Sequence, residues 1–293
     1  MKIQFENKVM SSLLLFIDHE IVQKGDAYTN RGSAFYKIDS LFKDYYVYAS
    51  PFKQLVSDTG ITGSSTPPVL SGVHFSTPGT TSYTEGPRYP GSGGFDSVNH
   101  MQGQLYFTGD TDPVAGSGIS GYYAVKDFNV FLTSMPEEQL LFETKLELNP
   151  RTTQIPAGVD SNTQTYPAIF IKDNGGRNEE WAFGGIEQTV INARAIVLAD
   201  SMFSLDAVCG ILKDSVRKPM PIINQSDLYL NALGAFTGVK YNYTEAATGE
   251  FCNIDRVTVS KNIANRGDFE NLNPNVFSAF VDFELISHRM PRL

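Results

Sequence analysis

Apolar residues recur with the period of a helix face near the beginning of the chain. In residues 10–24 they fall at steps of three and four, which predicts an amphipathic helix. The positions concerned are Met10, Leu13, Leu14, Ile17 and Ile21. Ser11 or Ser12 is expected to cap the start of this helix, and Gly25 is expected to end it.

A second amphipathic helix is predicted over residues 203–218. Its apolar face consists of Leu205, Val208, Cys209, Leu212 and Val216. Asp200 and Ser201 are residue types that cap helix starts, and Pro219 cannot continue a helix. This segment is the strongest helix prediction in the sequence.

Alternating or continuous apolar runs predict strands in the rest of the chain. Residues 140–148 alternate clearly between apolar and charged positions, which indicates a strand with one solvated face, whereas residues 191–199 are mostly apolar on both faces. Residues 122–133 form one long strand or two. The predicted strands are residues 45–49, 69–75, 104–107, 122–133, 140–148, 166–171, 191–199, 255–260 and 276–286.

Segments rich in Gly, Pro, Ser and Thr separate these runs. Residues 59–68 and 76–94 are predicted to be long loops that reach neighbouring proteins, and residues 26–33 a polar turn region. Residues 172–180 are predicted to turn around Asn174, Gly175 and Gly176. The elements together predict an α+β, β-rich fold, with a mixed or antiparallel sheet, two main helices and a loop-rich β insertion.

Composition and charge restrict the functions that fit. The 293 residues suffice for one large domain or two ordinary ones, and 41% hydrophobic residues support a real core. The net charge is −9 and no run of Lys or Arg occurs, so ordinary DNA binding through phosphate contacts is excluded. The longest apolar run, residues 13–17, is far shorter than the roughly 20 residues of a membrane span.

Residues of chemical interest do not form a recognisable catalytic or metal motif. His19, His74, His100 and His288 lie far apart in sequence, without a partner at ligand spacing. The two cysteines, Cys209 and Cys252, match no zinc site, which indicates free thiols and assembly in a reducing compartment. We therefore expect no enzyme activity, no catalytic or metal-binding residue and no cofactor.

Aromatic residues are the best candidates for contacts with other proteins. Aromatics make up 12% of the chain, and Phe and Tyr suit both half-buried strands and subunit interfaces. The interface candidates are Tyr45, Tyr46, Tyr48, Phe95, Tyr106, Phe203, Phe277 and Phe283.

The last third of the chain resembles the tail terminator proteins of tailed bacteriophages. A strand in RAIVLADSMFSLDAVCGILKD (residues 194–214) runs into a capped helix, and two closing strands follow in IDRVTVS (254–260) and NVFSAFVDFELI (275–286). The segment VNHMQGQLYF (98–107) is similar to a β-turn-β segment of phage neck and connector proteins. The resemblance implies a tail-terminator-like α/β core of residues 1–25 plus 165–293, and a β-rich, loop-rich insertion or second domain of residues 26–164.

The resemblance also implies a function. It predicts a structural virion subunit that forms a hexameric ring at the neck or head-proximal end of the tail, joining tail tube and sheath to the head connector. The expected partners are other copies of the chain and the tail tube, tail sheath and neck or connector proteins. DNA is expected only to pass through the lumen, no membrane is involved, and the ring is expected to assemble in the host cytoplasm and end in the virion.

Two other functions remain open from the sequence. One is another structural virion protein, such as a head-closure, capsid decoration or baseplate subunit, which would have the same composition but a different symmetry. The other is a β module that binds glycans or a host surface through exposed tyrosines.

Overall fold

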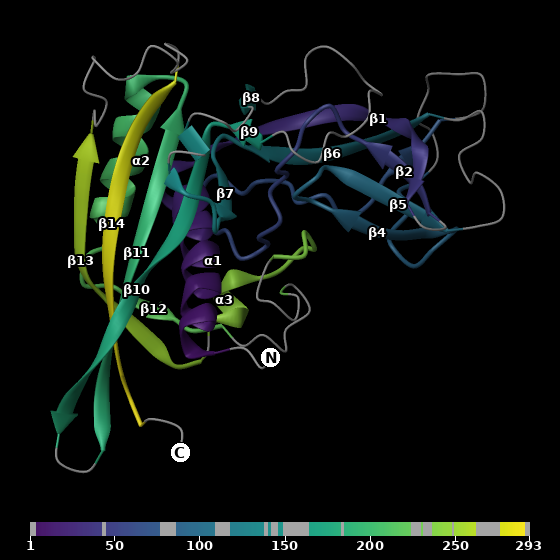
Figure 1. Ribbon diagram of the computed structural model, residues 1–293. Helices are drawn as coiled ribbons and strands as arrows, with labels where there is room; N and C mark the ends of the chain where they lie inside the picture. Colours follow the sequence, from purple (N-terminus) through teal and green to yellow (C-terminus); the bar gives the residue numbers. More distant parts are fainter. Residues whose placement is uncertain are drawn as a thin grey trace.

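Figure 1 shows the computed structural model of the chain. The structure describes residues 4–42, 45–76, 86–108, 118–137, 140–141, 146–148, 164–182, 185–223, 230, 236–247, 249–261 and 276–290. These residues form two six-stranded sheets, a small two-stranded sheet and two long helices. The α+β, β-rich class predicted from the sequence is confirmed.

The first sheet lies at the right of Figure 1 and has the strand order β3-β6-β1-β2-β5-β4. All its neighbouring strands are antiparallel. The strands are β1 (Tyr28–Phe42), β2 (Tyr45–Ala49), β3 (His74–Phe75), β4 (Phe95–Asn99), β5 (Gln104–Thr108) and β6 (Ile119–Lys126).

The second sheet, at the left of Figure 1, has the order β12-β13-β14-β11-β10-β7. Its neighbours are antiparallel except β7 and β10, which are parallel. The strands are β7 (Asn129–Leu132), β10 (Ala168–Ala182), β11 (Ile186–Ala199), β12 (Pro219–Pro221), β13 (Phe251–Lys261) and β14 (Phe277–Arg289). The short strands β8 (Leu146–Leu148) and β9 (Gln164–Tyr166) pair separately, in parallel.

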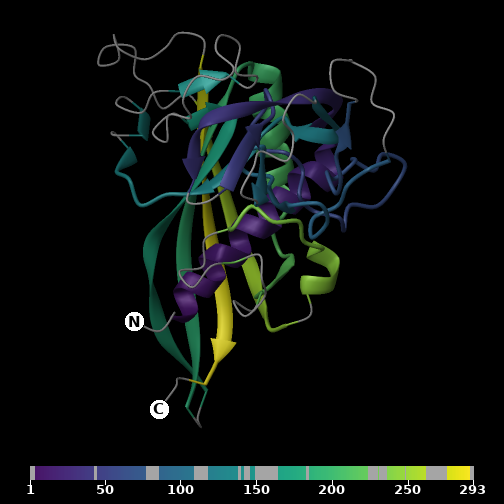
Figure 2. The ribbon, with the colours of Figure 1, turned by 90° about the vertical axis from the view of Figure 1, so that its right-hand side faces the viewer.

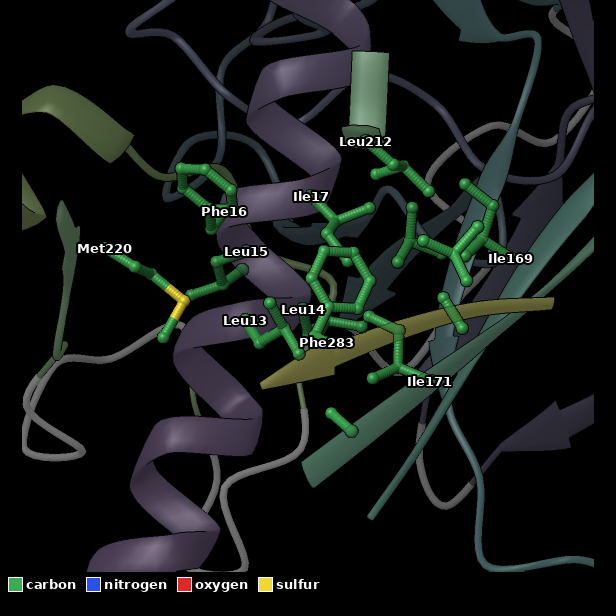
Figure 3. Close-up of a cluster of buried hydrophobic side chains, with 14 of the residues drawn as sticks. Leu13, Leu14, Leu15, Phe16, Ile17, Ile169, Ile171, Leu212, Met220 and Phe283 are labelled. Atoms are coloured by element: carbon green, nitrogen blue, oxygen red, sulfur yellow. The ribbon is translucent and has the colours of Figure 1, made fainter. Parts of the chain in front are cut away.

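Two helices, α1 (Phe5–Gly25) and α2 (Met202–Lys213), cover one face of the second sheet. Side chains on this face of the strands, such as Ile171 and Phe283, pack against Leu13, Ile17 and Leu212 of the helices (Figure 3). The other side of α1 meets the first sheet region, where Val22 packs with Val56 and Ala124. Because α1 lies between the two sheets, it is buried over almost all of residues 9–18.

Within the described residues, an apolar cluster covers the opposite face of the second sheet at one end, where Phe170, Ile196 and Leu198 pack with Leu140 and Tyr166. Beside this cluster the face carries the charged side chains of Arg194, Asp282 and Glu284. The second sheet therefore has a helix-covered face and a face that is partly open.

Helix α1 begins one turn before the predicted start. Ser11 and Ser12 lie inside the helix, where their hydroxyls donate to the carbonyl oxygens of Asn7 at 2.9 Å and Lys8 at 2.7 Å. They are not N-caps, which corrects the prediction. The first turn was missed because it is partly exposed and polar, so it adds little to the apolar period. Gly25 is the last helical residue, and Asp26 follows with a left-handed φ of 44°.

Helix α2 begins where the sequence predicts and ends earlier. The Ser201 hydroxyl accepts a hydrogen bond from the backbone N–H of Ser204 at 3.1 Å, which confirms it as the N-cap. The helix ends at Lys213 instead of residue 218, and the chain then makes a turn with a left-handed φ of 62° at Arg217. The short helix α3 (Tyr243–Ala246) was not predicted.

Most predicted strands exist, and two predicted turn regions are wrong. Residues 26–33 contain the start of β1, and residues 172–180 continue β10, so neither is a turn. Strand β1 was missed because much of it is exposed and lacks apolar alternation. Residues 122–133 form two strands, and only His74–Phe75 of the predicted strand 69–75 is a strand. Residues 77–85 of the predicted loop 76–94 and residues 142–145 of the predicted strand 140–148 lie outside the described residues.

The two sheets use different parts of the chain. Strands between residues 28 and 126 form the first sheet, whereas β7 at Asn129–Leu132 already belongs to the second sheet. The domain boundaries inferred from the sequence remain a prediction.

Candidate interaction surface

Strands β10 and β11 continue as a long hairpin beyond the helices that cover the second sheet. We call residues 173–182 and 185–190 of this hairpin the arm; it extends below helix α1 in Figures 1 and 2. The two strands pair from Ala168 opposite Leu198 to Ala182 opposite Ile186. Strand β14 flanks β11 as far as Glu187, which lies opposite Arg289. The arm is thus three-stranded almost to its tip and continues the second sheet.

A β-bulge lies where the sequence predicts a turn. The register shifts between Asp173 and Gly176, and the Asp173 carboxylate accepts a hydrogen bond from the backbone N–H of Gly175 at 2.7 Å. Gly175 has a φ of 79°, and a Cβ atom at Gly176 would lie 2.2 Å from the carbonyl oxygen of Val190. Glycines are therefore required at both positions so that the strand can pass through the bulge.

Trp181, the single tryptophan of the chain, lies near the end of the arm. Its side chain is 61% exposed, and its ring packs edge-on against His288 with 4.6 Å between ring centroids. Arg177 and Glu179 form an exposed ion pair on the same arm. A large aromatic side chain held in solvent on a projecting element is typical of a contact with another molecule.

A second exposed aromatic residue lies at the opposite end of the second sheet. Phe203, in the first turn of α2, is 84% exposed. Phe277 is partly exposed and lies at the start of β14, opposite Ala199, at the same end of the sheet. Both residues belong to the sequence-predicted interface set, and the structure leaves both accessible.

The remaining candidates of that set fall into two groups. Tyr45 and Tyr106 pack edge-on at 5.8 Å in the first sheet, and Tyr46 is half-buried beside them. Tyr48, Phe95 and Phe283 are buried in the interior, so aromatic positions that the sequence marked as interface candidates are core positions here. Aromatic residues on strands occur both in protein interiors and in interfaces, and the sequence alone does not distinguish the two positions.

The open face of the second sheet carries a network of charges. Arg194 of β11 donates to Asp282 of β14 at 2.6 and 3.1 Å, and also to Glu137 at 3.1 Å. Glu284 lies beside Arg177 and Arg256, at 3.9 and 4.0 Å. A shallow pocket of about 290 Å³ lies among Arg194, Arg256, Asp282 and Glu284, and Asn174 and Thr258 also line it.

A buried cluster of polar groups joins α1 to the first sheet. Lys126, the last residue of β6, donates to both carboxylate oxygens of Asp18 at 2.6 and 2.7 Å, and the Tyr241 hydroxyl donates to the same carboxylate at 3.2 Å. Beside it, His19 donates to Asp58 at 2.6 Å. Asp18 and Lys126 are almost completely buried. This arrangement holds elements together and presents no nucleophile to solvent.

The four histidines are not brought together. His100 is buried, with its two ring nitrogens 2.9 and 3.1 Å from the carbonyl oxygens of Gly238 and Leu70, and burial lowers its pKa to about 4. His74 packs near Tyr122, and His288 against Trp181. Within the described residues, no group of three or more His, Cys, Asp or Glu side chains is placed to hold a metal ion.

Sequence reasoning missed the arm, Trp181 and the buried ion pair. The arm was hidden by the Asn174-Gly175-Gly176 run, which reads as a turn. The only sequence signal for a longer strand was the polar, glycine-poor stretch that follows these two glycines. The pairing of Asp18 with Lys126, which are 108 residues apart, has no local signature.

Comparisons with known proteins add no relative to this picture. Neither a search of protein-family models nor a search of curated proteins finds a match to the chain. None of the helices in the described part of the chain is long and apolar enough to cross a membrane.

Proposed function

We propose that the chain is a structural subunit of a tailed-phage virion whose copies associate into a ring at the neck or head-proximal end of the tail. The observation that carries this proposal is the arm, which projects from the fold and holds Trp181 in solvent. Trp is among the residues most enriched in subunit contacts. A protein that folds with such an arm is suited to contact another chain.

The geometry and charge also suit repeated head-to-tail contacts. The arm and the exposed Phe203 lie toward opposite ends of the second sheet, so the accessible surfaces differ at the two ends. Contacts between unlike surfaces generate closed rings when the rotation between copies closes. A net charge of −9 lets DNA pass a central opening without being held by the subunits.

The proposal extends to the partners and location of the ring. In it, the chain contacts other copies of itself, the tail tube, the tail sheath and neck or connector proteins. The ring assembles in the host cytoplasm, where Cys209 and Cys252 stay reduced, and ends in the virion. The role is structural and needs no cofactor.

The test is the mass of the purified protein, measured by light scattering behind a sizing column, with negative-stain images of the peak. We expect a ring of about six copies, in keeping with the terminator resemblance and closed cyclic symmetry. Trp181→Ser should shift the mass toward the monomer, whereas Tyr89→Ser, which alters a similarly exposed ring in another region, should not. A wild-type protein that stays monomeric at high concentration would contradict the proposal.

A second candidate function is supported by one feature of the first sheet. Tyr122 is 73% exposed and lies over Gly32, and Tyr36 is exposed on the neighbouring strand β1. Exposed tyrosine rings on a flat sheet are suited to stacking on sugars. A glycan array that shows binding by wild-type protein, lost in Tyr122→Ala, would favour a glycan- or host-surface-binding module. Images with another symmetry would favour a head-closure, decoration or baseplate subunit.

A further inference from the structure

The second sheet has an open edge on each side. Strand β12 pairs with β13 only at residues 251–253, and the backbones of Arg217 and Lys218 bond to Ile254 at 2.6 and 3.1 Å. Within the described part of the chain, no strand accompanies residues 255–261 on their outer side. On the other side, β7 pairs with residues 168–171 of β10, and no described strand continues along residues 172–182. Along both stretches the outer backbone N–H and C=O groups have no partner strand among the described residues.

We propose that these two edges pair with each other between copies, so that residues 172–178 of one subunit add as a strand to residues 255–260 of the next, with the bulged residues Asn174 and Gly175 opposite Thr258. The inference rests on the proposed ring and names the contact that builds it. Strands β13, β14, β11 and β10 alternate in direction, so β10 runs opposite to β13. A second copy that continues the sheet by rotation about a ring axis therefore brings the edges together antiparallel.

The β13 edge has the sequence and shape of a strand that accepts a neighbour. Its register with β14 is unbroken from Arg256 opposite Glu284 to Lys261 opposite Ala279. Val257 and Val259 pack toward the core, whereas Thr258 is exposed, so the segment alternates regularly and has high strand propensity. Neither proline nor a bulge interrupts residues 256–261 of this edge, although such devices commonly block exposed edges; the arm edge carries the bulge at residues 173–176.

Charges at the ends of the two edges are complementary. In the antiparallel alignment the arm continues past the paired residues toward the end of β13 where Arg217 and Lys218 lie. At that point the arm carries Glu179 and Glu180, which are exposed, as is Arg217. Opposite charges at the end of the added strand favour this partner and this direction. Within the paired stretch Arg177 comes opposite Arg256, and each of these arginines has Glu284 of its own subunit within 4.0 Å, which offsets their repulsion. The second copy of the chain is thus the occupant that the edge fits.

Engineered disulfides can test the contact directly, because both native cysteines are buried. Thr258→Cys places a thiol on the β13 edge, and Asn174→Cys places one on the arm; both side chains border the pocket on the same face of the sheet. Within one molecule β14 and β11 separate the two strands, a span of about 14 Å that no disulfide bridges. Lys172→Cys tests the neighbouring register on the arm.

Mild oxidation followed by non-reducing gel electrophoresis gives the readout. We expect a mixture of the two single variants to yield covalent dimers only, and the Thr258→Cys/Asn174→Cys double variant to yield a ladder up to the number of copies in the ring. A matched control pairs Thr258→Cys with Glu245→Cys, which lies on α3 away from both edges, and should give no ladder.

The outcomes separate the inference from the proposed function. Rings seen by light scattering without cross-links from either arm position would overturn the edge pairing and leave the ring intact. A monomeric protein without cross-links would overturn both. A ladder of equal strength from the Glu245→Cys control would show random collision and would also overturn the edge pairing.

Discussion

The buried ion pair between Asp18 and Lys126 gives a direct test of how the two sheets are held together. Asp18 belongs to α1, which packs on the second sheet, and Lys126 ends β6 of the first sheet. The side chains are 8% and 5% exposed, and the Tyr241 hydroxyl also donates to the carboxylate. We expect Asp18→Leu and Lys126→Met to destabilise the protein strongly when made singly.

The magnitude follows from the charge that each single variant leaves behind. Removing one partner leaves the other ion buried without compensation, which costs about 3–5 kcal/mol of unfolding free energy. At roughly 2–4 °C per kcal/mol for a chain of this size class, the melting temperature should fall by about 6–20 °C. A loss of this size is a large fraction of the about 5–15 kcal/mol that stabilises a typical fold.

The double variant Asp18→Leu/Lys126→Met should be more stable than either single variant. It replaces the pair by apolar side chains of similar size, a change that is often neutral or stabilising. One cost remains, because the Tyr241 hydroxyl loses its hydrogen bond to Asp18, and a lost hydrogen bond in a buried site costs about 1–3 kcal/mol. Thermal unfolding followed by circular dichroism, with urea denaturation as a second measure, reports all three variants.

An exposed ion pair on the arm provides the control. Arg177→Gln breaks an exposed ion pair on the arm and should leave the melting temperature unchanged, because solvent screens such pairs. If the effects of the two single variants simply add in the double variant, Asp18 and Lys126 do not stabilise the fold as a pair. In that case an unpaired buried charge is not the cause of the loss of stability in the single variants.

Three further predictions concern titration, capping and thiol access. Burial lowers the pKa of His100 to about 4, below its usual 6.5, so the unfolded chain binds this proton more readily than the folded chain. The free energy of unfolding should therefore fall by about 3 kcal/mol as pH drops from 6.5 to 4. The His100→Gln variant should lose this part of the pH dependence, measured by urea denaturation at each pH. Ser201→Ala should cost about 1 kcal/mol and Ser201→Asp much less, measured by thermal unfolding. Burial raises the pKa of Cys252 to about 12 and also raises the pKa of Cys209. A thiol reagent at pH 8 should therefore modify neither thiol in the native protein, and it should modify both after unfolding.

The parts of the fold that the sequence predicted are those where burial and local periodicity agree. Strands β11 and β14 are flanked on both sides in the sheet, and their apolar residues alternate or run continuously. Helix α2 has one buried face and a hydrogen-bonded cap, and both features are local in sequence. Such elements can be found without knowing what packs on them.

Elements stabilised mainly by backbone pairing escaped sequence reasoning. Strand β1 is held between β6 and β2, yet many of its side chains are in solvent, so its pattern resembles that of a turn region. In β10 the Gly175 and Gly176 pair forms a bulge within a strand, and the same residues would suit a turn equally well. The partner strand decides between the two structures, and it lies outside the local sequence.

The candidate interaction surface was predicted in part. Phe203 was expected in an interface and is accessible, because an aromatic residue in the first turn of a helix, outside the apolar face, has no core to enter. Phe95 and Phe283 fill the interior, since each lies on a strand side that faces the core. Trp181 was missed because its exposure depends on the arm, which the sequence did not reveal.

The arrangement of the two sheets suggests a division of roles within the subunit. Both open edges and the arm belong to the second sheet, whose core is formed with α1 and α2. The first sheet joins this body through α1 and the buried ion pair, and it contributes no strand to either edge. The proposed pairing between copies therefore involves the second sheet alone. The first sheet, with Tyr122 exposed on it, is then held in a fixed orientation on each copy and is available for a different partner.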